Sequence, residues 1–161
     1  MCNAMAPLMR KGPVLYCFSP GFYPTEGAFA FSSSVATRDL ISAQLRYFQM
    51  KGWKRVAVIT STDASGQDAA KNVKEVLANP EYKDIELVSN VTFNPTDVSA
   101  SSQIQRIKGA KPQALIAWST GAAIGTVFKA IIEAGLAIPV ATTDGNMTYA
   151  QMTQYADFLP K

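Results

Sequence analysis

The chain has 161 residues, a formal net charge of +3, and 48% apolar against 17% charged residues. This length suits a folded unit that buries roughly 70% of its unfolded surface, and the composition excludes a disordered chain. Lysines and arginines are scattered beside acidic residues, which argues against a nucleic-acid partner. No apolar run approaches the roughly 20 residues that cross a bilayer. Residues 1–11 lack the apolar core of a signal peptide.

The first 36 residues are predicted to contain one helix and one strand. The helix is expected over residues 3–11, with an apolar stripe formed by Ala4, Met5, Leu8 and Met9. A strand follows over residues 14–18, and the stretch 28–33 is expected to be an extended crossover. The irregular segment 19–36 is longer than most loops of compact domains, so we interpret it as a hinge between two lobes.

The two cysteines, Cys2 and Cys17, are too few to form a metal site by themselves. Cys2 would open the predicted helix and Cys17 would end the predicted strand, which places both at one edge. That geometry allows a disulfide. Two separate buried thiols are the interpretation that the sequence favours, and no CxxC redox motif is present.

From residue 37 onward, predicted helices and strands alternate. The expected helices cover 37–50, 67–78, 97–109, 122–134 and 148–155. Thr37 is the predicted N-cap of the first of these and Asp97 that of the third. The expected strands cover 56–60, 85–93, 115–118 and 140–142. This alternation predicts an α/β fold, a Rossmann-like parallel sheet with helices on both faces. The strand of Val56 is expected to be central, flanked by the strands of Leu87 and Leu115, with a crevice where the winding reverses.

Three of these strands run into polar loops, TSTDASGQ, STGAAIG and TTDGN. Because the carboxyl ends of parallel strands meet at one edge, these loops predict a single wall of a small-molecule cleft. Asp63 is predicted to hydrogen-bond its own loop as an Asx-turn. For Asp144, the sequence supports two interpretations equally: the side chain structures its own loop, or it faces the cleft.

Enzymatic chemistry finds little support in these loops. The chain has no histidine, so the commonest general base and neutral metal ligand are missing, and Ser61, Ser65 and Ser119 have no base to activate them. Gly121 and Gly125 lack the lysine of a phosphate-binding loop and are predicted to relieve packing between helix and sheet. The loops therefore favour reversible binding of a small polar or aromatic molecule, without a cofactor.

The ordered segments GPVLYCFSPG, KRVAVI with its following GQD, NPTDVSA and AGLAIPVATTDGN resemble the type I periplasmic binding proteins. The nearest resemblance is to the branched-chain amino-acid (Leu/Ile/Val-type) substrate-binding subunits of ABC importers, also called extracellular ligand-binding receptors. It covers essentially the whole chain. It implies one lobe of a Venus-flytrap protein, in which residues 1–36 are a remnant of the N-terminal lobe and hinge. Residues 37–161 would form the C-terminal ligand-binding lobe, truncated at its end.

The resemblance implies ligand-binding residues on two elements near the hinge. The turn after the first strand normally offers groups to a ligand carboxylate, which points to Ser19, Gly21 and Tyr23. The loop before GQD often carries an aromatic residue in amino-acid binders, and Ser65 occupies that position. A serine there argues against a branched-chain amino acid.

Three further positions are implied on the later loops. Thr120 corresponds to the loop after AWST, with Trp118 just before it, and Asp144 matches the acid that holds a ligand ammonium. Asp144 thus favours an amine-bearing ligand. Trp118 favours an aromatic carboxylate if it reaches the cleft, although a tryptophan on a strand more often belongs to the core.

The implied function is the solute-binding component of an ABC importer, which binds an amino-acid-like or aromatic carboxylate ligand between its lobes and delivers it to a membrane permease. The implied location is the periplasm, or the cell surface as a lipoprotein, with the signal peptide outside this chain. The alternatives are a ligand-sensing regulatory receptor of the amide-sensor type and, less favoured, an α/β enzyme. With one wall of the cleft, the chain is expected to bind weakly and to self-associate.

Overall fold

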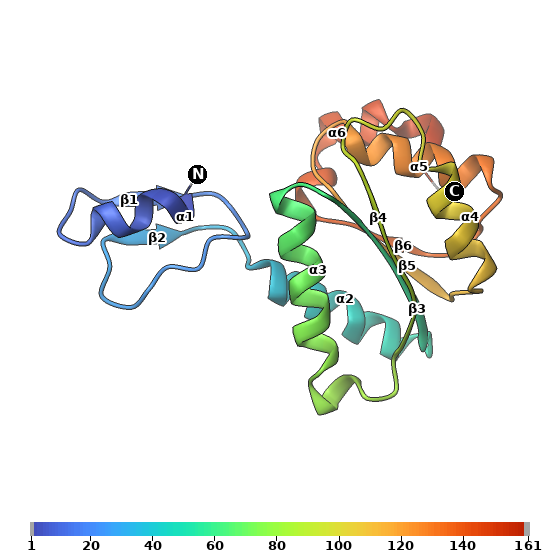
Figure 1. Cartoon of the computed structure of the whole chain (residues 1–161), viewed down its shortest axis with the longest axis horizontal. Helices are drawn as coiled ribbons and strands as arrows, with labels where there is room; N and C mark the ends of the chain where they lie inside the picture. Colours follow the sequence, from blue (N-terminus) through green and yellow to red (C-terminus); the bar gives the residue numbers. More distant parts are fainter. Residues whose placement is uncertain (1, 160–161) are drawn as a thin grey trace.

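The computed structural model describes residues 2–159 and consists of two parts (Figure 1). A small N-terminal part holds a helix and a two-stranded sheet, and a larger α/β body begins with the first long helix. Residues 160–161 of the predicted C-terminal lobe lie outside the described residues. No helix in the described part is long and apolar enough to cross a membrane.

The body is built on a four-stranded sheet in the order β4-β3-β5-β6, with every neighbouring pair parallel. Its strands are β3 (Arg55–Ser61), β4 (Glu86–Phe93), β5 (Ala114–Trp118) and β6 (Val140–Ala141). The predicted parallel pairing and the central place of the Val56 strand are confirmed. The five residues of β5 are all buried, as are Val56 to Ser61 of β3, because helices cover both faces of the sheet.

Two long helices cover each face of the sheet (Figure 1). They are α2 (Thr37–Met50) and α3 (Ala64–Leu77) on one face, and α4 (Ser101–Gly109) and α5 (Ala123–Glu133) on the other. Alternation along β3 sends Val56 and Val58 into the core under α2 and α3, and Ala57 and Ile59 into the core under α4 and α5. Short elements complete the body: η2 (Pro80–Tyr82), η3 (Asp144–Asn146), α6 (Tyr149–Gln154) and η4 (Ala156–Phe158).

The starts of α3 and α4 differ by three or four residues from the sequence prediction because aspartate side chains hold the preceding turns. α3 begins at Ala64 rather than Gln67, since the Asp63 carboxylate accepts a hydrogen bond from the Gly66 amide at 3.0 Å and caps the helix. α4 begins at Ser101 rather than Asp97, whose carboxylate instead accepts from the Asn94 amide. Thr37 is the first residue of α2 and not its N-cap.

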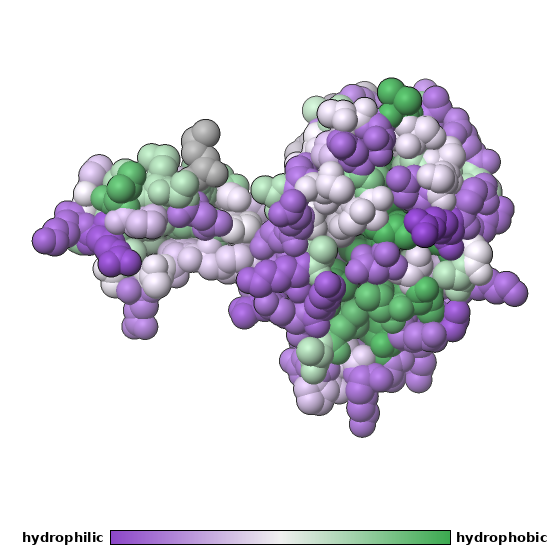
Figure 2. All heavy atoms as spheres, viewed as in Figure 1, coloured by the Kyte–Doolittle hydropathy of each residue, from purple (hydrophilic) through white to green (hydrophobic). Residues whose placement is uncertain are grey.

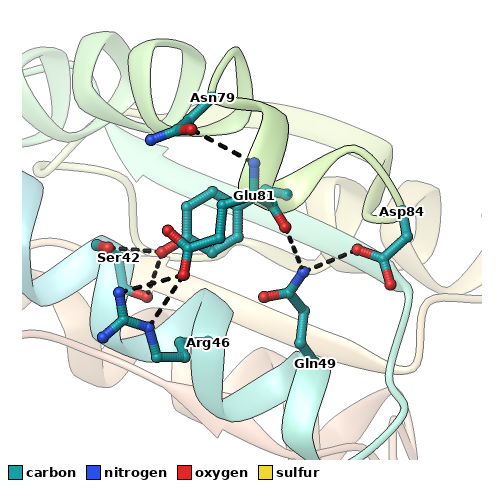
Figure 3. Close-up of polar contacts among 7 residues, drawn as sticks. Ser42, Arg46, Gln49, Asn79, Glu81 and Asp84 are labelled. Atoms are coloured by element: carbon teal, nitrogen blue, oxygen red, sulfur yellow. Dashed lines mark hydrogen bonds and ion pairs between the residues drawn. The ribbon is translucent and has the colours of Figure 1, made fainter.

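A set of polar contacts fastens α2 to η2 (Figure 3). The hydroxyls of Ser42 and Tyr82 share a hydrogen bond of 2.6 Å, and Gln49 Nε2 donates to the Glu81 carbonyl and to Asp84 Oδ1, both at 2.8 Å. The hydrogen bond from Gln49 lowers the pKa of the Asp84 carboxyl below its usual value. Arg46 pairs with Glu81 at 3.2 Å. Because these groups satisfy one another, this cluster fastens α2 to η2 and has few groups left for a ligand.

The N-terminal part contains more regular structure than predicted. Its elements are α1 (Cys2–Met5), η1 (Ala6–Met9), β1 (Leu15–Cys17) and β2 (Ala30–Ser32). β2 pairs in parallel with β1, so the predicted extended crossover is a strand. The predicted single helix changes to a 3-10 helix at Ala6, next to Pro7, which has no amide hydrogen to donate.

Cys2 and Cys17 form a disulfide, so the interpretation as two separate thiols is wrong. Their Cα atoms are 6.3 Å apart, within the usual range for a disulfide. The bond ties α1 to β1 in a part whose described residues include only three fully buried apolar ones, Cys17, Phe22 and Ala30. Cores this small are usually reinforced by a covalent link.

Reduction of this disulfide, or the double substitution Cys2→Ala and Cys17→Ala, is expected to loosen the N-terminal part by about 3 kcal/mol, the value for a loop of this length. The loss should be local. Hydrogen exchange should show faster exchange of the Leu15 and Ser33 amides, which donate across the small sheet, with β3 amides unchanged. Equal protection before and after reduction would mean that packing alone holds this part.

Candidate functional site

The predicted wall of polar loops is present at the carboxyl edge of the body sheet. Ser61 ends β3, and its hydroxyl donates to Asp63 Oδ1 at 2.8 Å. At the neighbouring strand ends, Asn146 is 1% exposed and its Nδ2 donates to the Ser119 carbonyl at 2.7 Å and to Thr142 Oγ1 at 2.8 Å. The loop after β5 is thereby fixed to the loop after β6. Sequence reasoning did not single out Asn146.

A hollow of about 380 Å³ lies where the N-terminal part meets this edge. It is lined by residues of α1, of the turn after β1, and of the first turns of α2 and α3, together with the loop after β5: Cys2, Asn3, Phe18, Ser19, Pro20, Gly21, Phe22, Thr37, Ala64, Ser65, Asp68 and Thr120. Its walls therefore come from both parts of the chain, which Figure 1 shows side by side.

The turn after β1 lines the hollow and is held by three hydrogen bonds. The Phe22 amide donates to the Ser19 carbonyl at 3.1 Å and closes the turn. The Thr37 amide donates to the Pro20 carbonyl at 3.1 Å, and Asn3 Nδ2 donates to the Gly21 carbonyl at 3.1 Å. Residues of α1 and α2 thus hold the turn from two sides by hydrogen bonds.

Four of the residues predicted from the resemblance line this hollow together: Ser19, Gly21, Ser65 and Thr120. They come from segments up to 101 positions apart in the sequence, so the fold brings them to one place. Ser65 reaches it because α3 begins early and carries this residue in its first turn.

The other three predicted site residues lie elsewhere. Tyr23 is exposed, and its hydroxyl accepts a hydrogen bond from Asn72 Nδ2 at 3.3 Å. Trp118 is 1% exposed and packs in the core under α2 and α3. Asp144 is exposed at the start of η3, where its Oδ1 accepts from the Gly145 amide at 3.0 Å. None of the three lines the hollow.

Asp68 is a charged residue of the candidate site that sequence reasoning missed. It lines the hollow, and the neighbouring buried Asn72 donates to its Oδ1 at 3.1 Å. The predicted start of α3 at Gln67 gave no reason to place this turn against the hinge. The GQD segment itself was the available signal, since its glycine allows α3 to approach β3 closely.

Several buried side-chain oxygens at the sheet edge have no partner among the described residues: Thr60 Oγ1, Ser119 Oγ, Thr143 Oγ1 and Asn146 Oδ1. Buried polar atoms of this kind are normally hydrogen-bonded to protein, water or ligand. Ser119 directly precedes Thr120, which lines the hollow. The edge therefore has hydrogen-bonding groups that residues 2–159 leave without a partner.

A second hollow, of about 470 Å³, lies at the end of α5 and is lined by Ile131, Ile132, Gly135, Leu136, Ala137, Ile138 and Pro139. None of these side chains is polar. Ligand sites combine apolar walls with a few convergent polar groups. The smaller hollow at the hinge fits that description better and is the candidate site.

The family model described as periplasmic binding protein matches residues 1–157. The chain belongs to the periplasmic binding protein family. No curated protein sequence matches it. The periplasmic binding protein family is a binding and receptor family, and the resemblance noted from the sequence is thereby confirmed.

Solved structures of such proteins share the fold. A type 1 periplasmic binding protein from Bordetella pertussis Tohama I has 17% identity and a TM-score of 0.77, covering 98% of this chain and 44% of that chain. A solute-binding protein of an ABC transporter from Rhodopseudomonas palustris, in complex with 4-hydroxybenzoate, has 20% identity and a TM-score of 0.77, covering 97% and 44%. An amino-acid ABC transporter substrate-binding protein from Pseudomonas fluorescens Pf-5 has 16% identity and a TM-score of 0.76, covering 98% and 43%. This chain thus spans less than half the length of each.

Proposed function

We propose that this chain is part of a solute-binding component of an ABC importer, and that the hollow at the hinge is one wall of its ligand site. The ligand is a small amino-acid-like molecule or an aromatic carboxylate. The observation that carries the proposal is the convergence of Ser19, Gly21, Ser65 and Thr120 on one hollow. Two of the similar structures support the ligand classes by their own descriptions, one with 4-hydroxybenzoate and one as an amino-acid transporter subunit.

The same proposal divides the chain into two lobes. Residues 1–36 belong to one lobe and the hinge, and residues 37–161 belong to the second lobe. The separate two-stranded sheet of the N-terminal part and the four-stranded sheet of the body support this division. The partner of such a protein is a membrane permease, and its location is the periplasm or the outer cell surface.

Exposed apolar groups support self-association of the chain. On the N-terminal part, Tyr16, Phe18, Phe29 and Phe31 are each about half exposed or more. Tyr16 and Phe31 are register partners on neighbouring strands, so they share one face of the small sheet. Figure 2 shows a second apolar area on the body, where Figure 1 has the sheet edge formed by β4. Large exposed apolar patches favour association.

The 161-residue chain is expected to bind its ligand no more tightly than about 1 mM, or about −4 kcal/mol. A Venus-flytrap site gains affinity when two lobes close and exclude water. In an open hollow, each hydrogen bond contributes only about 0.5–1.5 kcal/mol net, which hardly offsets the entropy of association.

The measurement is a titration of the isotope-labelled monomer followed by amide NMR shifts, with amino acids and aromatic carboxylates raised into the millimolar range. Saturable shifts should centre on the amides of Ser19, Gly21, Ser65 and Thr120. If no probe of either class shifts these amides, the proposed function of the hollow is wrong. Micromolar binding by the monomer would instead mean that this chain is a complete receptor.

A further inference from the structure

The hinge hollow is lined by an acidic side chain and by no basic one among the described residues. Among residues 2–159, Asp68 is the only charged residue that lines it, and no lysine or arginine of that range does. This is notable in a chain with 15 basic against 12 acidic residues. Among residues 2–159, no lysine or arginine forms an ion pair with the Asp68 carboxylate. Asp68 is therefore the one formal side-chain charge among the described residues that line the hollow.

The Asp68 carboxylate is held in a fixed position. Asn72, 4% exposed, lies one helical turn further along α3. Its Nδ2 donates to the Asp68 carbonyl at 2.8 Å and to Asp68 Oδ1 at 3.1 Å. The same amide group reaches the Tyr23 hydroxyl at 3.3 Å, which ties this network to the N-terminal part. Asn72 is thus a positioning residue for Asp68.

The second oxygen of Asp68 points to the turn after β1. A Cβ atom placed on Gly21 would lie 3.1 Å from Asp68 Oδ2, so the absence of a side chain at Gly21 keeps this oxygen open. Gly21 also lines the hollow. A half-buried carboxylate with one oxygen engaged and one oxygen free favours a cationic hydrogen-bond donor beside it.

We infer that the ligand of the hinge hollow carries a positively charged amine, and that Asp68 pairs with this amine and selects amine-bearing ligands over plain carboxylates. The inference rests on the proposed function, because it concerns the ligand of the same hollow. It distinguishes the two ligand classes named there. The ligand is amino-acid-like, and the hollow is a poor site for an aromatic acid that has no amine.

Asp144, which the resemblance assigns to a ligand ammonium, is less suited to this role in the structure. Its side chain is exposed, it structures the turn at Gly145, and it does not line the hollow. If Asp68 binds the amine, only its substitution should remove the preference for amine-bearing ligands. If Asp144 binds the amine, only the substitution of Asp144 should do so.

The test uses two pairs of probes that differ only by an α-amino group: leucine with 4-methylpentanoate, and 4-hydroxyphenylglycine with 4-hydroxyphenylacetate. Dissociation constants for the full chain are measured by amide NMR titration. At least one amine-bearing probe should bind about fivefold more tightly than its partner, as a partly exposed ion pair allows. In Asp68→Asn this preference should disappear, while the asparagine still accepts the hydrogen bond from Asn72. The control Asp157→Asn, on η4 and outside the hollow, should keep the preference.

The remaining outcomes overturn the inference in distinguishable ways. Preference for the plain carboxylates, or an amine preference that survives in Asp68→Asn, removes the role of Asp68 but leaves the proposed solute-binding function intact. Loss of the preference in Asp144→Asn alone assigns the amine to Asp144 instead. Failure of all four probes to shift the amides of the hollow counts against both the inference and the proposed function. Amide spectra of each variant confirm that it is folded before titration.

Discussion

Gly66→Ala is expected to destabilise the body by about 3 kcal/mol or more, the range of severe overpacking. Gly66 lies in the first turn of α3, where the helix passes directly over the end of β3. A Cβ atom on Gly66 would overlap the carbonyl oxygen and the amide nitrogen of Ser61. These are backbone atoms of the central strand, so they have little freedom to move away. The helix would have to shift, and its cap at Asp63 would be lost with it.

A matched control is available in the same protein. Gly109 is the last residue of α4, and a Cβ atom placed there meets no atom within 4 Å. Gly109→Ala should therefore be neutral or stabilise the chain by at most about 1 kcal/mol through helix propensity. Urea denaturation followed by circular dichroism measures both variants. Equal midpoints for Gly66→Ala and the parent chain would show that α3 does not approach β3 as closely as described.

The parallel sheet could be predicted from the sequence because its strands are buried on both faces. The runs around Val56 and Leu115 are continuous and apolar, and polar helices with one apolar face separate them. Strand order then followed from the rule that winding reverses at a central strand. The three-residue pairing of β1 with β2 has no such pattern. The disulfide and the packing of Cys2 and Ala6 against this small core accompany the pairing, and sequence periodicity does not reveal them.

The positions of the helix starts were harder to predict because they depend on single side chains. Asp63 and Asp97 are both plausible N-caps, yet only Asp63 accepts from an amide in the first turn of its helix. The early start of α3 also determines which residues line the candidate site. With α3 starting at Ala64, Ser65 and Asp68 fall on its first turns and reach the hollow. Asn72 is buried on the same helix, where a periodic apolar pattern predicts no polar residue.

Trp118→Ala is expected to destabilise the body by about 3–5 kcal/mol, the cost of removing a large buried ring. Trp118 ends β5 and is 1% exposed, in the core that α2 and α3 form with the sheet. Trp118→Phe retains much of the ring packing and should cost about 1–2 kcal/mol. Chemical denaturation measures both values, and a loss below about 1 kcal/mol for Trp118→Ala would contradict the packing.

The same residue also tests the site, because the resemblance placed Trp118 beside the ligand. The chain has two tryptophans, so Trp53→Phe leaves Trp118 as the only indole. Its fluorescence should be blue-shifted, poorly quenched by acrylamide and unchanged when leucine or 4-hydroxyphenylacetate is added into the millimolar range, since the ring faces the core and not the hollow. Trp118→Phe should likewise leave the dissociation constants of these probes unchanged. A ligand-dependent emission change, or weaker binding by a folded Trp118→Phe variant, would restore Trp118 to the binding site and require the loop after β5 to open toward the ligand.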